Sequence, residues 1–348
     1  MGERDGYHRF SFDALNDVSL DALATLTDAA WRADYRGVSR VNFDQTYLAR
    51  LMSGKDWIAV AVVAPNDDLV GFELGVGRTL KTPMGQYDAT YVTAFSVAPD
   101  HRRRGLGGWV LEGINERVFQ SAGNDLIFST FHSGHAGSPT VQSTYDAANL
   151  AVNRFHSTPL WVRRLNREPL PPMPDVEFHR LIDRAPDAAG DRNMPVRRLG
   201  DAIPTFLDPY SAHFRFDRGF RESYLSASDE RSGTIWLGSP ETGLGVIYSL
   251  LPCATDDSPT YLIGLVHAVL SPPGTEVTIK SALAFMMQFF AERECIAILT
   301  VDLGAYSSTV LSDLGFAHEE DTISFAVRGS EPLVRAINVE PPFFLDFI

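Results

Sequence analysis

The chain has 348 residues, 45% of them hydrophobic and 21% charged, and a formal net charge of −14. One hydrophobic core rarely spans such a length, so the sequence predicts two domains. The composition excludes a disordered or collagen-like chain, and the negative charge argues against a nucleic-acid partner while it suits a cationic amine as substrate. The same charge is equally consistent with a role in solubility alone.

We expect a cytoplasmic protein with no membrane partner. The sequence has no apolar run long enough to cross a bilayer, and its first ten residues, MGERDGYHRF, lack the apolar core of a secretory signal. Cys253 and Cys295 lie far apart and in no metal-ligand spacing, so they are predicted to be small core residues rather than parts of a disulfide or a zinc site. The oligomeric state is left open between monomer and homodimer.

The first half of the chain alternates between β-rich runs and helical patterns. Strands are expected over Tyr7–Leu15, Trp57–Val63, Leu69–Gly77, Thr90–Ala98 and Leu126–Phe131. Helices are expected over Leu20–Tyr35, Phe43–Met52, Leu106–Ser121 and Val141–His156. A proline-rich connector follows, with one short strand expected at Val176–Leu181.

The second half repeats this order of elements, which favours an internal duplication. Helices are expected over Ile203–His213, Phe220–Ala227, Val277–Glu292 and Ser307–Leu314, and strands over Val196–Leu199, Thr234–Leu237, Gly245–Leu251, Tyr261–Leu270, Ile296–Val301 and Ile323–Val327. The predicted organisation is a domain over 1–166, a connector over 167–194, a second domain over 195–330 and an apolar tail over 331–348 that docks on this chain or on a second copy.

The strongest motif is an Arg-x-x-Gly-x-Gly turn between a strand and a helix, which runs from Arg102 through Gly105 to Gly107. Glycines let the backbone approach a phosphate closely, and the first N–H groups of a helix lack internal partners. The helix dipole adds positive potential at the same place, and Arg102–Arg104 add charge beside it. The segment therefore predicts a pyrophosphate-binding site.

This segment resembles the cofactor motif of the GNAT acetyltransferase superfamily, Arg/Gln-x-x-Gly-x-Gly/Ala; residues 92–118 match in detail and residues 7–165 match in the order of elements. The resemblance implies an α/β (α+β) fold of two tandem GNAT-like domains, each a mixed, mostly antiparallel twisted sheet flanked by helices. It implies acetyl-CoA as co-substrate, no metal, and N-acetylation of a small-molecule amine. The cofactor-binding residues that it implies are Phe95, Ser96, Val97, Arg102, Arg103, Arg104, Gly105, Leu106, Gly107, Gly108 and Asn149.

The sequence offers two candidates for the residue that protonates the departing thiolate. The family often uses a Tyr at the end of a run Asn-x-Ala-x-x-x-x-Tyr, and here the run from Asn149 ends in His156 instead. His156 either donates the proton or caps the end of the expected helix. Tyr145, earlier in the same segment, is the rival acid, with a structural role as its alternative. Glu73 is the candidate base if its side chain points inward, and a solvent-facing Glu is the alternative.

Other polar residues of the first half receive weaker assignments. His132 and His135 flank a glycine in a loop and are expected to contact substrate or solvent rather than a metal. In GNAT-like folds the segment between the first two helices covers the acceptor, so Trp31, Tyr35, Arg36 and Arg40 are candidates for shaping substrate choice, with ordinary packing as the alternative for Trp31.

The second half has lost the cofactor motif. Counted from Pro272, Thr278 and Lys280 stand where Gly105 and Gly107 stand in the first half, and Leu311 stands at the proton-donor position. A degenerate second copy is therefore expected. Two alternatives to an N-acetyltransferase remain: a catalytically silent acyl-CoA-binding module, and a tandem fold that uses aminoacyl-tRNA, against which the acidic charge and the intact motif argue.

Overall fold

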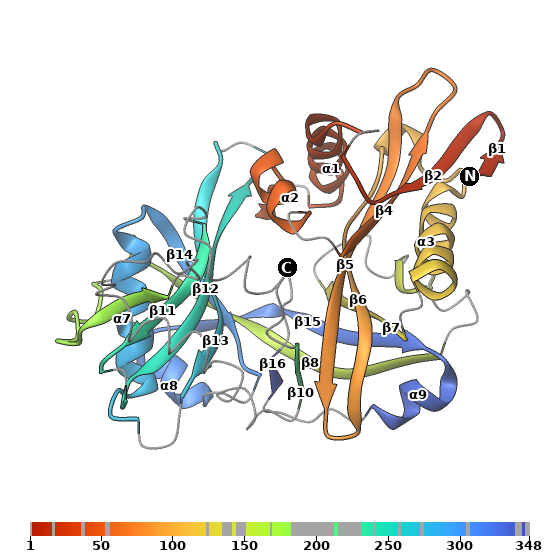
Figure 1. Ribbon diagram of the computed structural model, residues 1–348. Helices are drawn as coiled ribbons and strands as arrows, with labels where there is room; N and C mark the ends of the chain where they lie inside the picture. The colour runs from red at the N-terminus through yellow and green to blue at the C-terminus, as the bar shows by residue number, and fades with distance from the viewer. Residues whose placement is uncertain are drawn as a thin grey trace, which may run out of the picture.

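The computed structural model describes residues 2–15, 18–35, 39–52, 56–122, 125–133, 141–143, 151–167, 169–181, 212–214, 231–239, 241–256, 259–271, 275–303, 307–337 and 343–344 (Figure 1). In these residues, no helix is long and apolar enough to cross a membrane.

The first half builds a strand-rich layer with helices packed against it. Its strands are β1 (Gly2–Arg4), β2 (Tyr7–Phe12), β3 (Arg40–Val41), β4 (Trp57–Val63), β5 (Leu69–Thr82), β6 (Gly85–Val97), β7 (Leu126–His132) and β8 (Ala151–Arg164). Its α-helices are α1 (Leu20–Asp34), α2 (Gln45–Leu51) and α3 (Leu106–Glu116). A short 3-10 helix, η1 (Pro99–His101), precedes α3, and a short π-helix, η2 (Arg117–Ala122), follows it. Side chains of Ser19 and Asp44 accept hydrogen bonds from the first turns of α1 and α2, which fixes where these helices begin.

The second half has a corresponding set of elements. Its strands are β9 (Phe178–Leu181), β10 (Ala212–Phe214), β11 (Ser232–Leu237), β12 (Leu244–Ala254), β13 (Tyr261–Leu270), β14 (Cys295–Val301), β15 (Ala317–Gly329) and β16 (Phe343–Phe344). Its helices are α7 (Ile279–Ala291), α8 (Ser308–Asp313) and α9 (Glu331–Ala336). The short strand expected before residue 181 is confirmed as β9, and the expected tail contains α9 and β16, which pairs with β10.

The expected repetition of elements is confirmed by the strand pairing. In each half three strands pair antiparallel in chain order, β4-β5-β6 and β11-β12-β13, and the third pairs parallel with the strand that follows a helix, β7 or β14. In the first half α3 packs mainly on β4 and β5, and in the second half α7 packs on β13 and β14. The mixed, mostly antiparallel sheet flanked by helices agrees with the predicted fold class.

The two halves are joined by an exchange of strands. β15, from the end of the second half, pairs with β7 of the first half, and β8, from the first half, pairs with β14 of the second. β8 and β15 also pair with each other, so the described strands form one sheet in the order β1-β2-β4-β5-β6-β7-β15-β8-β14-β13-β12-β11-β9. Figure 1 shows β8 and β15 running across the middle of the molecule, between the two halves. The boundaries at 166, 194 and 330 stay predictions, and the sheet runs through both expected domains.

Two expected helices were wrong. Residues 141–143 are helical, but residues 151–156 belong to β8, whose neighbours β14 and β15 both come from the second half. Pairing with distant strands outweighs local helical spacing there. Ala212 and His213, expected as the last residues of the helix over Ile203–His213, belong to β10, which pairs with β5 through His213–Lys81 and Phe214–Leu80. The expected helix at 220–227, the expected strand at 196–199 and the rest of the helix over 203–211 lie outside the described residues.

The cysteine prediction is confirmed, since both thiols are buried and free. Burial raises the pKa of Cys253 to about 12 and that of Cys295 to about 12. Both therefore stay protonated at neutral pH.

Candidate functional site: a glycine-lined helix end beside a cavity

The glycine turn lies at the start of α3, as the motif predicts. Gly105 is the residue before the helix and has φ 75°, in the left-handed region that favours glycine, and Arg103 just before it has φ 63°. Trp109 N–H donates to the Gly105 carbonyl, which begins the helical ladder. In the described chain no side chain caps this helix end. The first-turn N–H groups of α3 are therefore available to an anion.

The space beside this helix end is tight at a second glycine. A Cβ placed on Gly107 would lie 3.3 Å from Cζ of Phe95 and 3.7 Å from Cγ2 of Val97. Both contacts are with the segment Phe95–Val97, whose residues the family resemblance implies in cofactor binding. A Cβ on Gly105 would lie 3.2 Å from a guanidinium nitrogen of Arg4. The turn thus fits the expected pyrophosphate cradle, with a cationic side chain at its rim.

The arginines of the motif have different surroundings. Arg102 forms an ion pair with Asp34 of α1, with Nη1 2.6 Å from Oδ1, and its Nη2 and Nε donate to the carbonyls of Ala30 and Val97. This side chain ties α1 to the glycine turn. Arg104 donates to the Tyr7 hydroxyl at 2.7 Å, and Arg103 is exposed.

β6 and β7 stop pairing beside this turn. Their parallel pairing covers Ala89–Val92 of β6 and Leu126–Ser129 of β7. Ala94, two residues after the last paired residue of β6, has φ 56°. The register between β5 and β6 also shifts here, between Phe72 and Leu74. Such a bulge bends a strand away from its neighbour. The bent segment Phe95–Val97 runs from the split to the glycine turn.

A cavity of about 710 Å³ opens at this split. It is lined by residues of α1, β3, β5, β6, β7 and β8 from the first half and of β12, β13, β14 and β15 from the second. Glu73 and Phe95 are among the lining residues. Glu73 is 2% exposed, so its side chain points inward rather than to solvent. The cavity therefore joins the expected thioester position to a space built by both halves.

Aromatic side chains of α1, of the residue after it and of β7 stack on one another in the lining of the cavity. Trp31 and Tyr35 stack with ring centroids 5.6 Å apart, and Tyr35 stacks on His132 of β7 at 6.1 Å. Trp31 Nε1 donates to the Phe95 carbonyl at 3.2 Å, which links this stack to the bent strand. Burial raises the pKa of Tyr35 far above its usual value, and the charges of Asp34 and Asp321 raise it further. Tyr35 stays neutral there.

His156, the first candidate acid, lies elsewhere than the sequence implied. It belongs to β8, opposite Phe325 of β15, and it is not among the residues that line the cavity. Burial lowers its pKa, an effect that Asp302 partly opposes. Tyr145, Asn149, His135 and Arg36 lie outside the described residues, so their expected roles stay predictions. Within the described ranges, no three His, Cys, Asp or Glu side chains gather closely enough to hold a metal ion.

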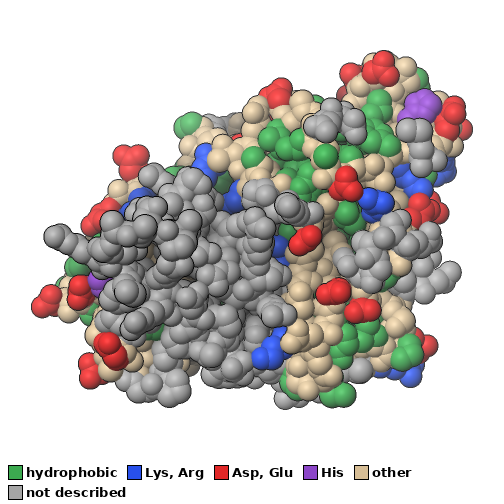
Figure 2. Space-filling view, in the orientation of Figure 1, with side chains coloured by type: hydrophobic (Ala, Val, Ile, Leu, Met, Phe, Trp, Pro, Cys, Tyr) green, Lys and Arg blue, Asp and Glu red, His purple; other side chains and the backbone are tan. Residues whose placement is uncertain are grey.

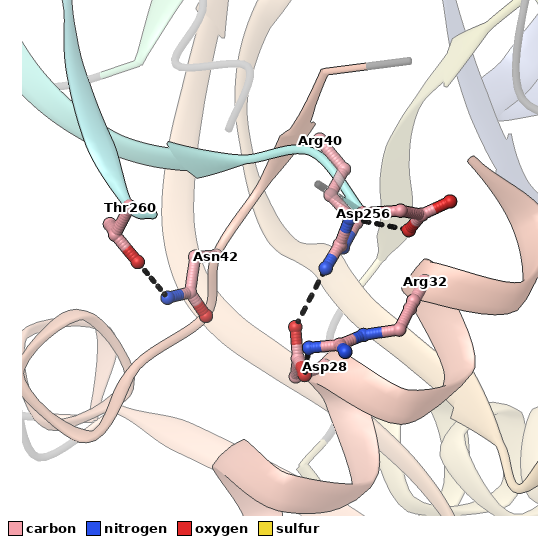
Figure 3. Close-up of polar contacts among 6 residues, drawn as sticks. All are labelled: Asp28, Arg32, Arg40, Asn42, Asp256 and Thr260. Atoms are coloured by element: carbon pink, nitrogen blue, oxygen red, sulfur yellow. Dashed lines mark hydrogen bonds and ion pairs between the residues drawn. The ribbon is translucent and has the colours of Figure 1, made fainter. Parts of the chain in front are cut away.

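The segment after α1 is held against the second half by polar contacts (Figure 3). Arg40, with a side chain 1% exposed, forms ion pairs at 3.3 Å with Asp28 of α1 and with Asp256 beyond β12. Asn42 donates to Thr260, and β3 pairs with β12 through Arg40 and Ala254. This segment, defined by residues 39–44 and called the docking segment below, lines the cavity through Ser39, Arg40, Val41 and Phe43.

The helix start of the second half is closed by its own side chains. Thr278 is the residue before α7, and its Oγ1 accepts from Ser281 N–H at 3.1 Å. Lys280, the second residue of α7, forms an ion pair with Asp313, with Nζ 3.0 Å from Oδ2. Leu311, at the place of the proton donor, is fully buried. These contacts agree with the expected loss of the phosphate site.

Several cavity residues were missed from the sequence. They come from β8, β13 and β15 and include Arg164, Tyr261, Glu319 and Asp321. They carry no motif, and only the long-range pairing brings them to the cavity.

In sequence, neither a family profile nor a curated protein matches the chain. In structure, it is similar to N-myristoyltransferase of Saccharomyces cerevisiae, solved with bound myristoyl-CoA, with a TM-score of 0.72 and 12% identity over 95% of this chain and 85% of that chain. A probable N-acyltransferase from Enterococcus faecalis gives 0.53, with 9% identity over 92% and 72% of the two chains. A GCN5-related N-acetyltransferase from Anabaena variabilis also gives 0.53, with 8% identity over 92% and 72%. Likeness at such identities concerns the fold.

Proposed function

We propose that the chain, whose fold is similar to that of solved N-acyltransferases, transfers an acyl group from a coenzyme A thioester to an amine. The observation that carries the proposal is the open, glycine-lined start of α3 at the end of a bent strand that borders a large cavity. The finer proposal is that the acyl group is acetyl and that the acceptor is a small-molecule amine.

Each part of the reaction has a place in this arrangement. The N–H groups of Arg103–Gly108 would hold the pyrophosphate, and the strand Phe95–Val97 would align the thioester. The neutral amine nitrogen would then attack the thioester carbonyl carbon, the carbon–sulfur bond would break, and the proton that the attacking nitrogen loses would balance the one that the thiolate takes up. An acceptor that enters as an ammonium must first lose a proton, and Glu73, at the bulge beside this strand, is placed to accept it.

The co-substrate supplies only the activated acyl group, so the chain must supply orientation and proton transfer. The paired side chains at the α7 start leave the second half no equivalent cradle, so we assign the cofactor to the first half alone. The second half contributes walls to the acceptor cavity instead. Nucleic acid and membrane are not proposed as partners.

The test is thiol release from acyl-CoA in the presence of amines. Acyl-CoA thioesters from acetyl to myristoyl should be offered with a panel of primary amines, and calorimetry should measure thioester binding in parallel. We expect binding of one thioester per chain and amine-dependent thiol release. Binding without release for every pair would favour the silent acyl-CoA-binding module, and no binding at all would contradict both.

A further inference from the structure

The floor of the cavity is a strip of apolar side chains that ends in an arginine. On β8 the residues Leu160, Val162 and Arg164 alternate onto one face and all line the cavity. Two apolar residues of the neighbouring strands lie beside the arginine end of this strip: Ala297 of β14 is paired with Arg164, and Ile263 of β13 is paired with Ala297. An extended apolar molecule would therefore find contact along this floor with Arg164 at its end.

Arg164 differs from the other arginine that lines the cavity. Arg40 is buried and both its terminal nitrogens contact carboxylates, of Asp28 and of Asp256. Arg164 is exposed, and it forms no hydrogen bond or ion pair with any residue that the structure describes. Burial raises the pKa of Tyr261, another lining residue, and the positive charge of Arg164 opposes part of this increase. Arg164 is thus a guanidinium that borders the cavity and is left to a ligand.

Negative charge lies at the opposite end of the strip. Glu73 borders the bent strand, and Asp321 contacts the aromatic stack, with Oδ2 3.9 Å from His132 Nε2. Asp321 and Glu319 belong to the irregular part of β15 that faces Leu160, where the register shifts between His318 and Thr322. From Leu160 to Arg164 the strand advances four residues, which is about 13 Å. The cavity therefore offers carboxylates near the reaction position and a guanidinium about one strand length away.

We propose that the acceptor is an amine whose apolar body ends in an anionic group, a carboxylate, which Arg164 binds. This inference rests on the proposed acyl transfer and names its substrate class. Arginine matches a carboxylate with two parallel charge-assisted hydrogen bonds, which gives both affinity and orientation. Such an acceptor has no net charge at neutral pH, so the net charge of −14 does not repel it. Figure 2 shows acidic side chains at several separate places on the face in view, so the negative field is not confined to one patch there.

A matched series of acceptors tests the proposal. The ω-amino acids aminohexanoate, aminooctanoate and aminoundecanoate should be compared with the alkylamines of the same length by thiol release. In the unchanged protein we expect the best ω-amino acid to exceed its alkylamine at least about tenfold in kcat/KM, which corresponds to about 1.4 kcal/mol. In Arg164→Gln this advantage should vanish, because kcat/KM for the ω-amino acids should fall to the level of the alkylamines.

Arg167→Gln is the matched control, because Arg167 is an exposed arginine in the turn after β8 and does not line the cavity. It should keep the carboxylate preference. Thiol release that does not distinguish carboxylates from alkylamines, or a preference that survives Arg164→Gln, would overturn the proposal and leave the acyl transfer standing.

Calorimetry with ω-aminooctanoate separates the other cases. Binding that Arg164→Gln weakens, without thiol release from any thioester, would support the carboxylate subsite and contradict the acyl transfer. Absence of both binding and turnover with every member of the series would overturn the two proposals together.

Discussion

At the scale of single residues, Gly107 gives the sharpest test of the cofactor site. In Gly107→Val the branched side chain would meet Phe95 and Val97 and fill the space beside the helix start. We expect binding of coenzyme A, measured by calorimetry, to fall at least about a hundredfold, by analogy with the loss of several charge-assisted hydrogen bonds. Lys280→Val, at the corresponding position of the second half, is the control and should bind as tightly as the unchanged protein. Unchanged affinity in Gly107→Val would contradict the site.

His156 gives a prediction for pH dependence. Burial lowers its pKa below 6.5, so the unfolded chain binds a proton there more readily than the folded chain does. Stability that neutral His156 helps to maintain is therefore lost as the pH falls below about 6.5. His156→Gln should lose less stability than the unchanged protein between about pH 7.5 and pH 5. Urea midpoints across this range measure the difference, and parallel curves for the two proteins would refute the prediction.

At the scale of elements, the docking segment depends on the ion pairs of Arg40. In Asp256→Asn the buried guanidinium keeps only Asp28, and we expect a loss of about 1–3 kcal/mol in the free energy of unfolding. The KM for the acceptor should rise, because residues of this segment line the cavity, while coenzyme A affinity stays the same.

Asp313→Asn provides the matched control for this variant. It breaks the exposed pair between Lys280 and Asp313, whose side chains are about half exposed, and should cost less than about 1 kcal/mol. A loss of coenzyme A affinity in Asp256→Asn, or an acceptor KM equal to that of the control, would show that the docking segment does not shape the acceptor cavity.

The elements also show which parts of the fold can be predicted from the sequence. Leu106, Val110, Ile114 and Val118 recur at helical spacing, and all four are buried under α3 and the turn after it. Thr278 was placed at the equivalent of Gly105 by counting, and it does precede α7. These features depend on neighbours in sequence. Residues 151–156 were assigned to a helix because their partners, β14 and β15, begin more than a hundred residues later. The cavity walls that β8 and the second half contribute could not be predicted for the same reason.

At the scale of the whole molecule, the strand exchange predicts that the two halves unfold together. β8 pairs with β14 and β15, and β15 pairs with β7, so unfolding of either half takes a neighbouring strand away from the sheet of the other. Variants with a single tryptophan, Trp109 in α3 or Trp236 in β11, should give the same urea midpoint by fluorescence. Two separate midpoints would indicate that the halves are independent.

The pairing of β7 with β15 also constrains the order in which the chain can fold during synthesis. β7 ends at His132 and β15 ends at Gly329, so nearly 200 residues must be translated before the edge of β7 is covered. At about 5–20 residues per second this takes roughly 10–40 s. Throughout that interval the nascent first half presents an unpaired strand edge. Such an edge can pair with the strand of another chain, including one on a neighbouring ribosome. Yield of folded protein should therefore respond to translation speed between codons 132 and 329 more than elsewhere.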